Sequence, residues 1–235
     1  MLFRSYIILW FLFQFLTEIS CQKTPFKPKL RTSQTTTLVD NKLYVLGGQD
    51  PLSGDLIGQF FYLDVSIPFD TKALSWKDLS SINTVPPHAG AASVKGGADN
   101  NTLFLYGGMS NNVMALVNSF DSRNEKWSVP KIPEVDIIRK QNLIGVIDDN
   151  GKMYLWSGKT VDEEVDTNDL LILDTINLSW SKGSMVGAPI PRIDYGAVLL
   201  SDKSIIYMGK NNNPRNFVIF IYLLLFSKYL LYRWF

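Results

Sequence analysis

Few side chains in this sequence are suited to catalysis or metal binding, and they are scattered. His88 in "VPPHAGAASV" is the single histidine, and Cys21 is the single cysteine. Thiol catalysis needs a reactive cysteine inside the folded body, and copper sites normally take more than one imidazole. A Ser–His–Asp set cannot be built with the only histidine on a connector between strands. The sequence therefore predicts no catalytic residue, no metal ligand and no cofactor.

Two polar stretches resemble ligand loops only at first sight. "VDEEVDTND" (Val161–Asp169) holds five acidic residues, and carboxylate oxygens bind divalent cations. It lacks the glycine and the spacing of a calcium-binding loop, so we predict a solvated loop. "KGGADNN" (Lys95–Asn101) is rich in glycine, but phosphate-binding loops precede helices. Because this stretch lies between two apolar runs, we predict a hairpin turn.

A repeated apolar pattern places these residues. Four segments contain aliphatic, aromatic and β-branched residues and end at a turn signal: "NKLYVLGG", "NTLFLYGG", "GKMYLWSG" and "SIIYMGK". They recur about every fifty residues, and such a period indicates a repeat architecture. The repeated glycines are Gly47, Gly48, Gly107, Gly108, Gly158 and Gly209.

Other residues recur with the same period. Tryptophans follow the first three glycine segments, at Trp76, Trp127 and Trp180, and each comes after an aspartate, at Asp64, Asp121 and Asp174. An apolar patch precedes each glycine segment, and a basic residue precedes each patch, at Arg31, His88, Arg139 and Arg192. The unit therefore consists of a strand, a turn, a strand ending at glycine, a long loop, a strand ending at aspartate, a turn and a strand starting at tryptophan.

This unit resembles the kelch-repeat family, whose marks are the double glycine, the aspartate and the tryptophan about six residues later. The resemblance covers roughly residues 31–210 and implies an all-β, kelch-type β-propeller built from four-stranded blades. We expect blades at 31–80, 88–130, 139–182 and 192–210, the last one partial, within a propeller region of 31–215. Such an arc of about three and a half blades predicts that another chain completes the ring, or that the sequence is a fragment of a longer one.

The recurring residues have physical roles in such a fold. The first glycine of a pair is expected to adopt positive φ, which side chains tolerate poorly. The second is expected to admit the backbone of a neighbouring segment. Each tryptophan is expected between adjacent blades, where its burial removes ~150–250 Å² of surface from water.

The beginning of the sequence has the layout of a secretory signal peptide. Residues 1–21 contain an early arginine, an apolar run and a polar end, and residues 22–30 form a linker. Export to the extracellular space or the cell surface would make Asn100 and Asn177 acceptors for N-glycosylation, since each begins an Asn-X-Ser/Thr tripeptide. Without cysteines in its body, the exported chain would depend on its core for stability.

A hydrophobic tail follows, at residues 216–235, and has three interpretations. It is a C-terminal membrane anchor, because its apolar residues outweigh a single lysine near its middle. It is an unusually hydrophobic third strand of the last blade. Or it is translated read-through of a retained intron or shifted frame, which we favour because the repeat pattern breaks off in mid-blade.

Function is the least determined property. Lys and Arg (23) nearly balance Asp and Glu (22), for a net charge of +1, so we expect no nucleic-acid binding. A resemblance to galactose oxidase-like kelch propellers implies a copper enzyme, but its histidines and its Tyr–Cys cross-link have no counterparts here. We predict a non-catalytic module that binds a protein or a carbohydrate through loops 49–59, 109–114 and 159–168. The alternatives are a fragment of such an oxidase and a membrane-anchored receptor or adhesion protein.

Overall fold

A computed structural model describes residues 25–133, 136–185, 188, 190–210, 217–223 and 228–232. The predicted signal peptide, residues 1–21, lies outside these residues. Among the described residues, no helix is long and apolar enough to span a membrane.

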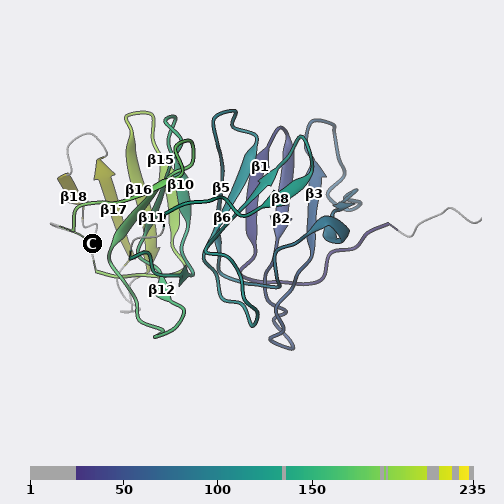
Figure 1. Cartoon of the computed structure of the whole chain (residues 1–235), viewed down its shortest axis with the longest axis horizontal. Coiled ribbons are helices and arrows are strands. Elements are labelled where there is room, and N and C mark those ends of the chain that lie inside the picture. The colour runs from purple at the N-terminus through teal and green to yellow at the C-terminus, as the bar shows by residue number, and fades with distance from the viewer. Residues whose placement is uncertain are drawn as a thin grey trace, which may run out of the picture.

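The described chain is all-β and forms four antiparallel sheets, here called blades 1 to 4, each of four strands in sequence order (Figure 1). Blade 1 contains β1 (Thr35–Val39), β2 (Lys42–Leu46), β3 (Phe60–Asp64) and β4 (Lys77–Asp78). Blade 2 contains β5 (Ala92–Gly96), β6 (Thr102–Tyr106), β7 (Val117–Asp121) and β8 (Lys126–Ser128). Blade 3 contains β10 (Gly145–Ile147), β11 (Lys152–Trp156), β13 (Leu170–Asp174) and β14 (Ser179–Lys182). Blade 4 contains β15 (Gly196–Leu199), β16 (Ser204–Lys210), β17 (Phe217–Leu223) and β18 (Lys228–Tyr232).

Two smaller elements complete the description. The short strands β9 (Lys140–Gln141) and β12 (Lys159–Thr160) pair with each other outside the blades. A single turn of 3-10 helix, η1 (Ser80–Ile82), follows β4.

Blade 4 differs from the half blade that the sequence predicted. β17 pairs with β16 over seven residues, from Ser204↔Leu223 to Lys210↔Phe217, and β18 pairs with β17. The described parts of the tail, residues 217–223 and 228–232, thus form strands of this sheet, and the first of them is the third strand that one interpretation expected. The composition of "FVIFIYL" explains this, because aromatic and β-branched residues favour strands. The read-through origin of the tail stays a prediction.

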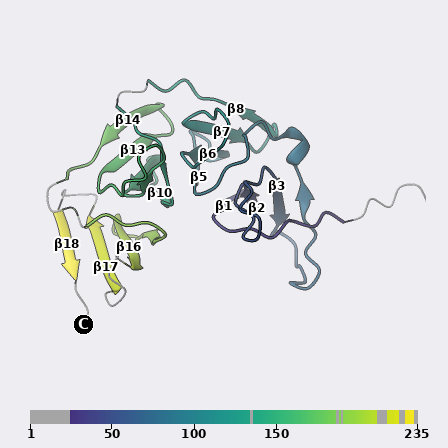
Figure 2. The same ribbon diagram turned by 90° about the horizontal axis from the view of Figure 1, so that it is seen from below.

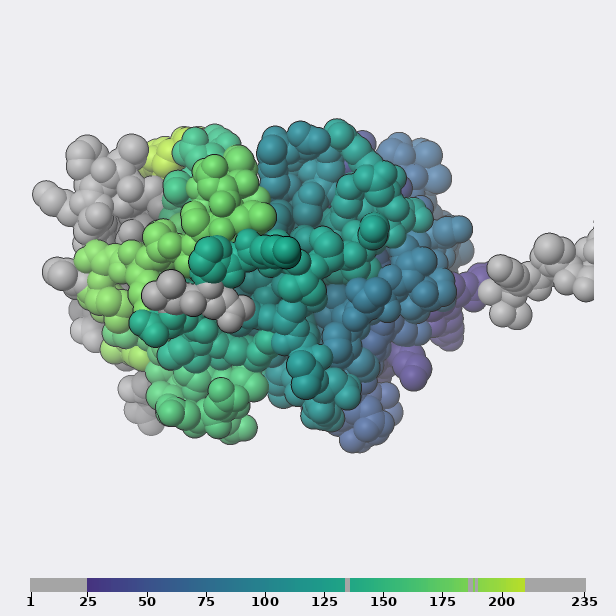
Figure 3. Space-filling model, viewed as in Figure 1, coloured from purple at the N-terminus to yellow at the C-terminus, as the bar shows by residue number. Residues whose placement is uncertain are grey.

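The four blades stand in an arc and follow one another in sequence order (Figure 2). The first strand of each blade contacts the first strand of the next: β1 with β5, β5 with β10, and β10 with β15. The space-filling view shows the same order, with the colours running from purple to yellow-green along the long axis of the molecule (Figure 3). Each blade therefore packs against the blades next to it in the sequence, as a propeller requires.

Aromatic side chains fill the space between blades 1 and 2. Trp127 of β8 is 6% exposed, and its ring centroid lies 5.2 Å from that of Phe60 in β3 and 5.1 Å from that of Phe120 in β7. Phe60 and Phe120 themselves meet edge to face at 4.8 Å, a favoured geometry for aromatic pairs. Trp127 thus lies between two blades.

The other two repeat tryptophans have different partners. Trp180 of β14 meets Tyr106 of blade 2 at 5.7 Å, so it too lies between blades. Trp76 precedes β4, is only partly buried, and packs at 5.1 Å against Phe61 of its own blade. Arg31 also lies over the ring of Phe61, at 4.8 Å from its centroid, and the ring of Phe26 lies 5.3 Å from that of Phe61. Among the described residues no blade precedes blade 1. This explains why Trp76, unlike Trp127 and Trp180, packs against no neighbouring blade.

We expect Trp127→Ala to lower the free energy of unfolding by about 3–5 kcal/mol, since it removes a buried aromatic side chain shared by two blades. Trp76→Ala should cost clearly less, because Trp76 is partly exposed and contacts a single blade. Urea unfolding followed by circular dichroism measures both. Equal losses of unfolding free energy in the two variants would contradict the conclusion that Trp127 holds two blades together.

Candidate functional site

One end of the arc gathers the longest connections. Because each blade has four antiparallel strands, the loops after β2, β6 and β11 and the connectors that start each blade lie at the same end. The bridges Thr32↔Gln49 and Ala89↔Met109 join these two kinds of segment. We call this end the loop face; it lies along the lower edge of the molecule in Figure 1. It comprises residues 47–59, 107–116 and 157–169 and the connectors 31–34, 86–91, 139–144 and 191–195.

The second glycine of each pair holds the next blade. The N–H of Gly48 donates to the carbonyl of His88 at 2.8 Å, and that of Gly108 donates to the carbonyl of Lys140 at 2.8 Å. The N–H of Gly158 donates to Arg192 in the same way at 3.2 Å. These glycines have φ of +107°, +80° and +93°, a region that favours glycine.

The first glycine of each pair is required because the backbone of the next blade also comes close to it. At Gly107, which has φ of +70°, a Cβ atom would lie 2.2 Å from the carbonyl oxygen of Lys140. Blade 3 has Ser157 at this position, also with positive φ, and its hydroxyl donates to the carbonyl of Arg192 at 2.8 Å and accepts from its N–H. Gly209 departs from the expected turn, because β16 continues through it and its φ is not positive.

The basic residues at the starts of the blades point inward, toward backbone carbonyls. Arg31 donates to the carbonyl of Gly47 at 2.9 Å, and Arg192 donates to that of Gly209 at 3.4 Å. In blade 3 the equivalent residue is Lys140, not Arg139 as its sequence position suggested. Lys140 is the residue whose carbonyl accepts from Gly108, as those of His88 and Arg192 accept from Gly48 and Gly158. Arg139, one residue earlier, reaches back to the carbonyl of Gly107 at 3.2 Å.

Lys140 is fully buried and paired. Its Nζ lies 3.1 Å from a carboxylate oxygen of Asp169 and 3.5 Å from the carbonyl of Leu155. Burial lowers the pKa of Lys140, and the negative charge of Asp169 opposes that shift. This ion pair, with the pairing of β9 and β12, holds the acidic stretch 161–169 in place. Its exposed acidic members are Asp162, Glu163 and Glu164, and no group of three or more metal-binding side chains occurs among the described residues.

His88 occupies the basic position of blade 2 and is 1% exposed. Its Nδ1 lies 2.7 Å from the carbonyl of Pro86, and its Nε2 has no hydrogen-bond partner. Burial lowers the pKa of His88, and nearby Arg139 lowers it further. The neutral imidazole therefore replaces the inward-pointing cation of the other blades.

Next to the basic positions, a second set of backbone hydrogen bonds passes from blade to blade. The N–H of Gly90 donates to Ser33 at 2.9 Å, that of Asn142 donates to Gly90 at 2.8 Å, and that of Asp194 donates to Asn142 at 3.1 Å. All four residues have φ between +51° and +68°. Sequence reasoning missed this set. Its signal is the residue type, since Gly, Asn and Asp tolerate left-handed backbone best.

These four left-handed residues surround a pocket of about 280 Å³, here called the axial pocket. Every blade contributes to it: Ser33 and Gln34, Gly90 and Ala91, Asn142, Leu143 and Ile144, and Asp194 and Tyr195. The side chains of Leu143 and Tyr195 are buried, whereas Ser33, Gln34 and Asp194 are exposed. The axial pocket therefore has apolar walls and a polar rim.

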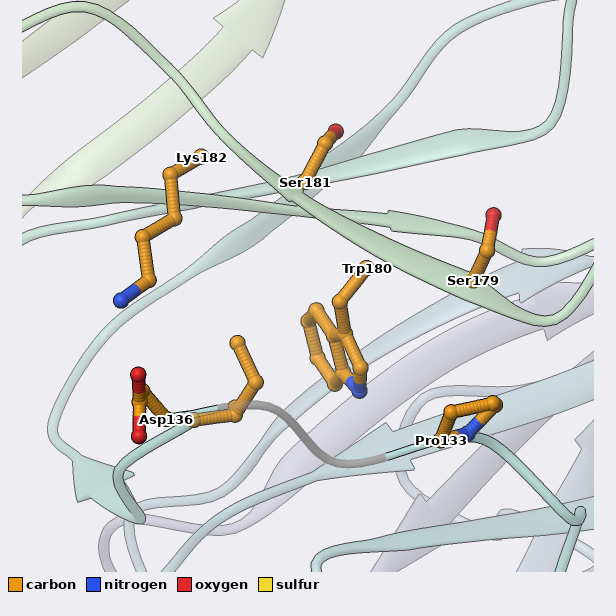
Figure 4. A pocket seen from close by; sticks show the side chains of 7 residues that line it. Pro133, Asp136, Ser179, Trp180, Ser181 and Lys182 are labelled. Carbon is orange, nitrogen blue, oxygen red and sulfur yellow. The ribbon is translucent and has the colours of Figure 1, made fainter.

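A second pocket, of about 420 Å³, lies on the outside of blade 3 (Figure 4). The side chain of Trp180 points from β14 toward the connector that carries Pro133 and Asp136, and Lys182 flanks it. This pocket is larger, but only β14 and one connector line it. We regard the axial pocket as the stronger candidate, because all four blades converge on it.

The opposite end of the arc carries structural turns. Asp64, Asp121 and Asp174 end the third strands, and their carboxylates accept hydrogen bonds from the turns that follow. The side-chain amide of Asn124 is the largest cause that lowers the pKa of Asp121. The two predicted glycosylation acceptors, Asn100 and Asn177, are exposed in turns at this same end.

Comparison with known proteins identifies what this chain is similar to. A family model described as the KLHDC2/KLHL20/DRC7 kelch-repeats domain matches residues 33–226. Kelch domain-containing protein 3 of Bos taurus is 26% identical over 208 residues, which are 80% of this chain and 50% of that protein. Acyl-CoA-binding domain-containing protein 6 of Oryza sativa subsp. japonica is 25% identical over 210 residues, 81% of this chain and 29% of that protein. The chain thus spans half or less of the length of these relatives.

The state of His88 predicts a pH dependence of stability. Its folded pKa is lowered, so the unfolded chain takes up a proton first, near the ordinary pKa of about 6.5. The free energy of unfolding should therefore fall as the pH drops from about 6.5 through the folded pKa. His88→Gln removes the titrating group, so its stability should fall less steeply between pH 7.5 and 5. Urea unfolding at a series of pH values measures both proteins. Parallel plots of unfolding free energy against pH would contradict a role of His88 in the pH dependence.

The glycine pairs predict a second, matched comparison. Gly54 and Gly107 both have positive φ, but a Cβ at Gly54 would meet only a side-chain atom at 3.9 Å. Gly54→Ala should cost about 1 kcal/mol for backbone strain alone. Gly107→Ala should cost about 1–3 kcal/mol more, because its Cβ overlaps the Lys140 carbonyl. If the two substitutions lower the free energy of unfolding equally, the close approach of the Lys140 carbonyl does not explain why position 107 is glycine.

Proposed function

This chain belongs to the kelch-repeat family, and we propose that it is a non-catalytic module that binds another protein through its loop face. The observation that carries the proposal is the axial pocket, to which all four blades contribute residues. Backbone hydrogen bonds between blades fix the segments around it, and recognition residues commonly lie on loops that a rigid scaffold positions.

The size of the axial pocket supports a macromolecular partner. Sites for drug-sized molecules and cofactors have volumes of roughly 300–1,000 Å³, and the axial pocket, at about 280 Å³, suits one side chain better than a large cofactor. The surrounding loops 49–59, 109–114 and 159–168 offer additional contact area. A carbohydrate partner is less favoured, since Tyr195 is the only aromatic residue among the described residues that line this pocket, and it is buried.

A non-catalytic role agrees with the state of His88 and Lys140, two basic groups whose pKa values are lowered by burial. His88 and Lys140 are buried and bonded to backbone or to Asp169, so neither side chain reaches the axial pocket. Proton transfer requires a group within hydrogen-bond reach of the substrate. Both residues instead act in the packing of consecutive blades.

We also propose that the chain enters the secretory pathway, as its first 21 residues and the exposed Asn100 and Asn177 favour. Expression in a eukaryotic secretory host should yield a glycosylated product whose mobility shifts on treatment with an endoglycosidase. Asn100→Gln and Asn177→Gln should each remove part of that shift. A product without glycans that stays inside the cell would contradict export.

Selection of peptides from a random display library tests protein binding directly. We expect peptides selected on the purified chain to lose at least about tenfold in affinity on Ile144→Ser, because Ile144 lines the axial pocket and is 39% exposed. Arg123→Ala is the control, since Arg123 is exposed at the opposite end. Fluorescence anisotropy measures both. Selected peptides that respond to Arg123→Ala and not to Ile144→Ser would place binding elsewhere.

A further inference from the structure

The rim of the axial pocket carries a negative charge without a counter-charge. Asp194 is exposed, its backbone is fixed by the hydrogen bond to Asn142, and within the described part of the chain no hydrogen bond or ion pair involves its carboxylate. The other polar groups on the rim are the neutral side chains of Ser33, Gln34 and Asn142. The pocket therefore presents an acceptor-rich rim with one full negative charge.

The cations of the loop face do not neutralise it. Arg31, Arg139 and Arg192 donate to backbone carbonyls, and Lys140 is buried against Asp169. Lys159 of β12 is the fifth cation of this face; it is half-buried and does not line the pocket. The exposed acidic residues Asp162, Glu163 and Glu164 lie on the loop of blade 3 at this same end. Because most of these cations are bonded within the protein, the exposed acidic side chains give the loop face a negative potential. Such a potential attracts positively charged groups.

The walls of the pocket fit the remainder of a basic side chain. Ala91, Leu143 and Ile144 supply aliphatic surface to the lining, and the buried ring of Tyr195 adds an aromatic one. Lysine and arginine bury an aliphatic stem against apolar surface while the charged head stays near polar groups. An acidic side chain would instead bring a second negative charge next to Asp194.

We propose that the axial pocket binds a lysine or arginine side chain of the partner protein, with the stem against Leu143 and Ile144 and the charge at Asp194. The proposal rests on the proposed function, because it names the chemical class of partner for the same site. It assigns to Asp194 the role of the specificity-determining residue.

Four small probes test this with the full chain: the N-acetyl amides of arginine, lysine, glutamine and glutamate. Titrations followed by the amide resonances of Ser33, Gly90, Asn142 and Asp194 should give saturable shifts with the arginine and lysine probes. Asp194→Asn should weaken that binding about tenfold. Asparagine tolerates positive φ, so this variant keeps the backbone hydrogen bond to Asn142. Glu163→Gln makes the same change of charge on the acidic loop and should alter affinity less than about twofold.

Each outcome has a defined meaning. Absence of saturable shifts with arginine and lysine, equal binding of the glutamate probe, or equal losses in Asp194→Asn and Glu163→Gln would overturn the proposal. Peptides selected by display should also be enriched in lysine or arginine. If they depend on Ile144 but contain no basic residue, the assigned partner chemistry is wrong while protein binding at the loop face stands. If they do not depend on Ile144, the proposed function itself fails.

Discussion

The backbone hydrogen bonds that pass from each blade to the start of the next determine the rest of this structure. Two sets of them run side by side, one from the second glycines to the basic positions and one along the left-handed residues Ser33, Gly90, Asn142 and Asp194. Each bond requires that two backbones approach without a Cβ atom between them, or that a residue accepts positive φ. Aromatic packing around Trp127 and Trp180 then fills the space between the sheets. Without the hydrogen bonds, sheets held only by apolar contacts would have no fixed rotation about a common axis, because the hydrophobic effect has no direction.

The same bonds produce the candidate site. They bring one short segment of each blade to a common point, so a pocket forms from residues that are far apart in the sequence. They also explain the distribution of charge, since Arg31 and Arg192 bond to carbonyls, Lys140 pairs with Asp169 and His88 is neutral, which leaves acidic groups such as Asp194 exposed. A binding face with fixed backbone and mostly neutral or acidic side chains is therefore a consequence of how consecutive blades are joined.

Much of this fold could be predicted from the sequence, because its strongest signals are local. The glycine pairs, the strand-ending aspartates and the tryptophans mark turns and strands that depend on neighbouring residues. Positions set by contacts between blades were harder to predict. Lys140 rather than Arg139 occupies the basic position, since a one-residue difference in a connector has no local signature. Trp76 has no second blade to pack against, Gly209 continues a strand, and "FVIFIYL" joins blade 4, because sheet pairing depends on partners distant in the sequence. The axial pocket was not predicted at all, as no single segment contains it.

Native-state hydrogen exchange followed by NMR tests the central claim most directly. If the hydrogen bonds between blades hold the arc together, the amides of Gly90, Asn142, Gly108 and Gly158 should exchange only through global unfolding, with the same free energy of opening as the central strand β6. Exchange of these four amides at the rate of the exposed loop amides near Asn111, while β6 remains protected, would contradict the account. The blades would then be independent sheets held by side-chain packing, and no fixed site would exist between them.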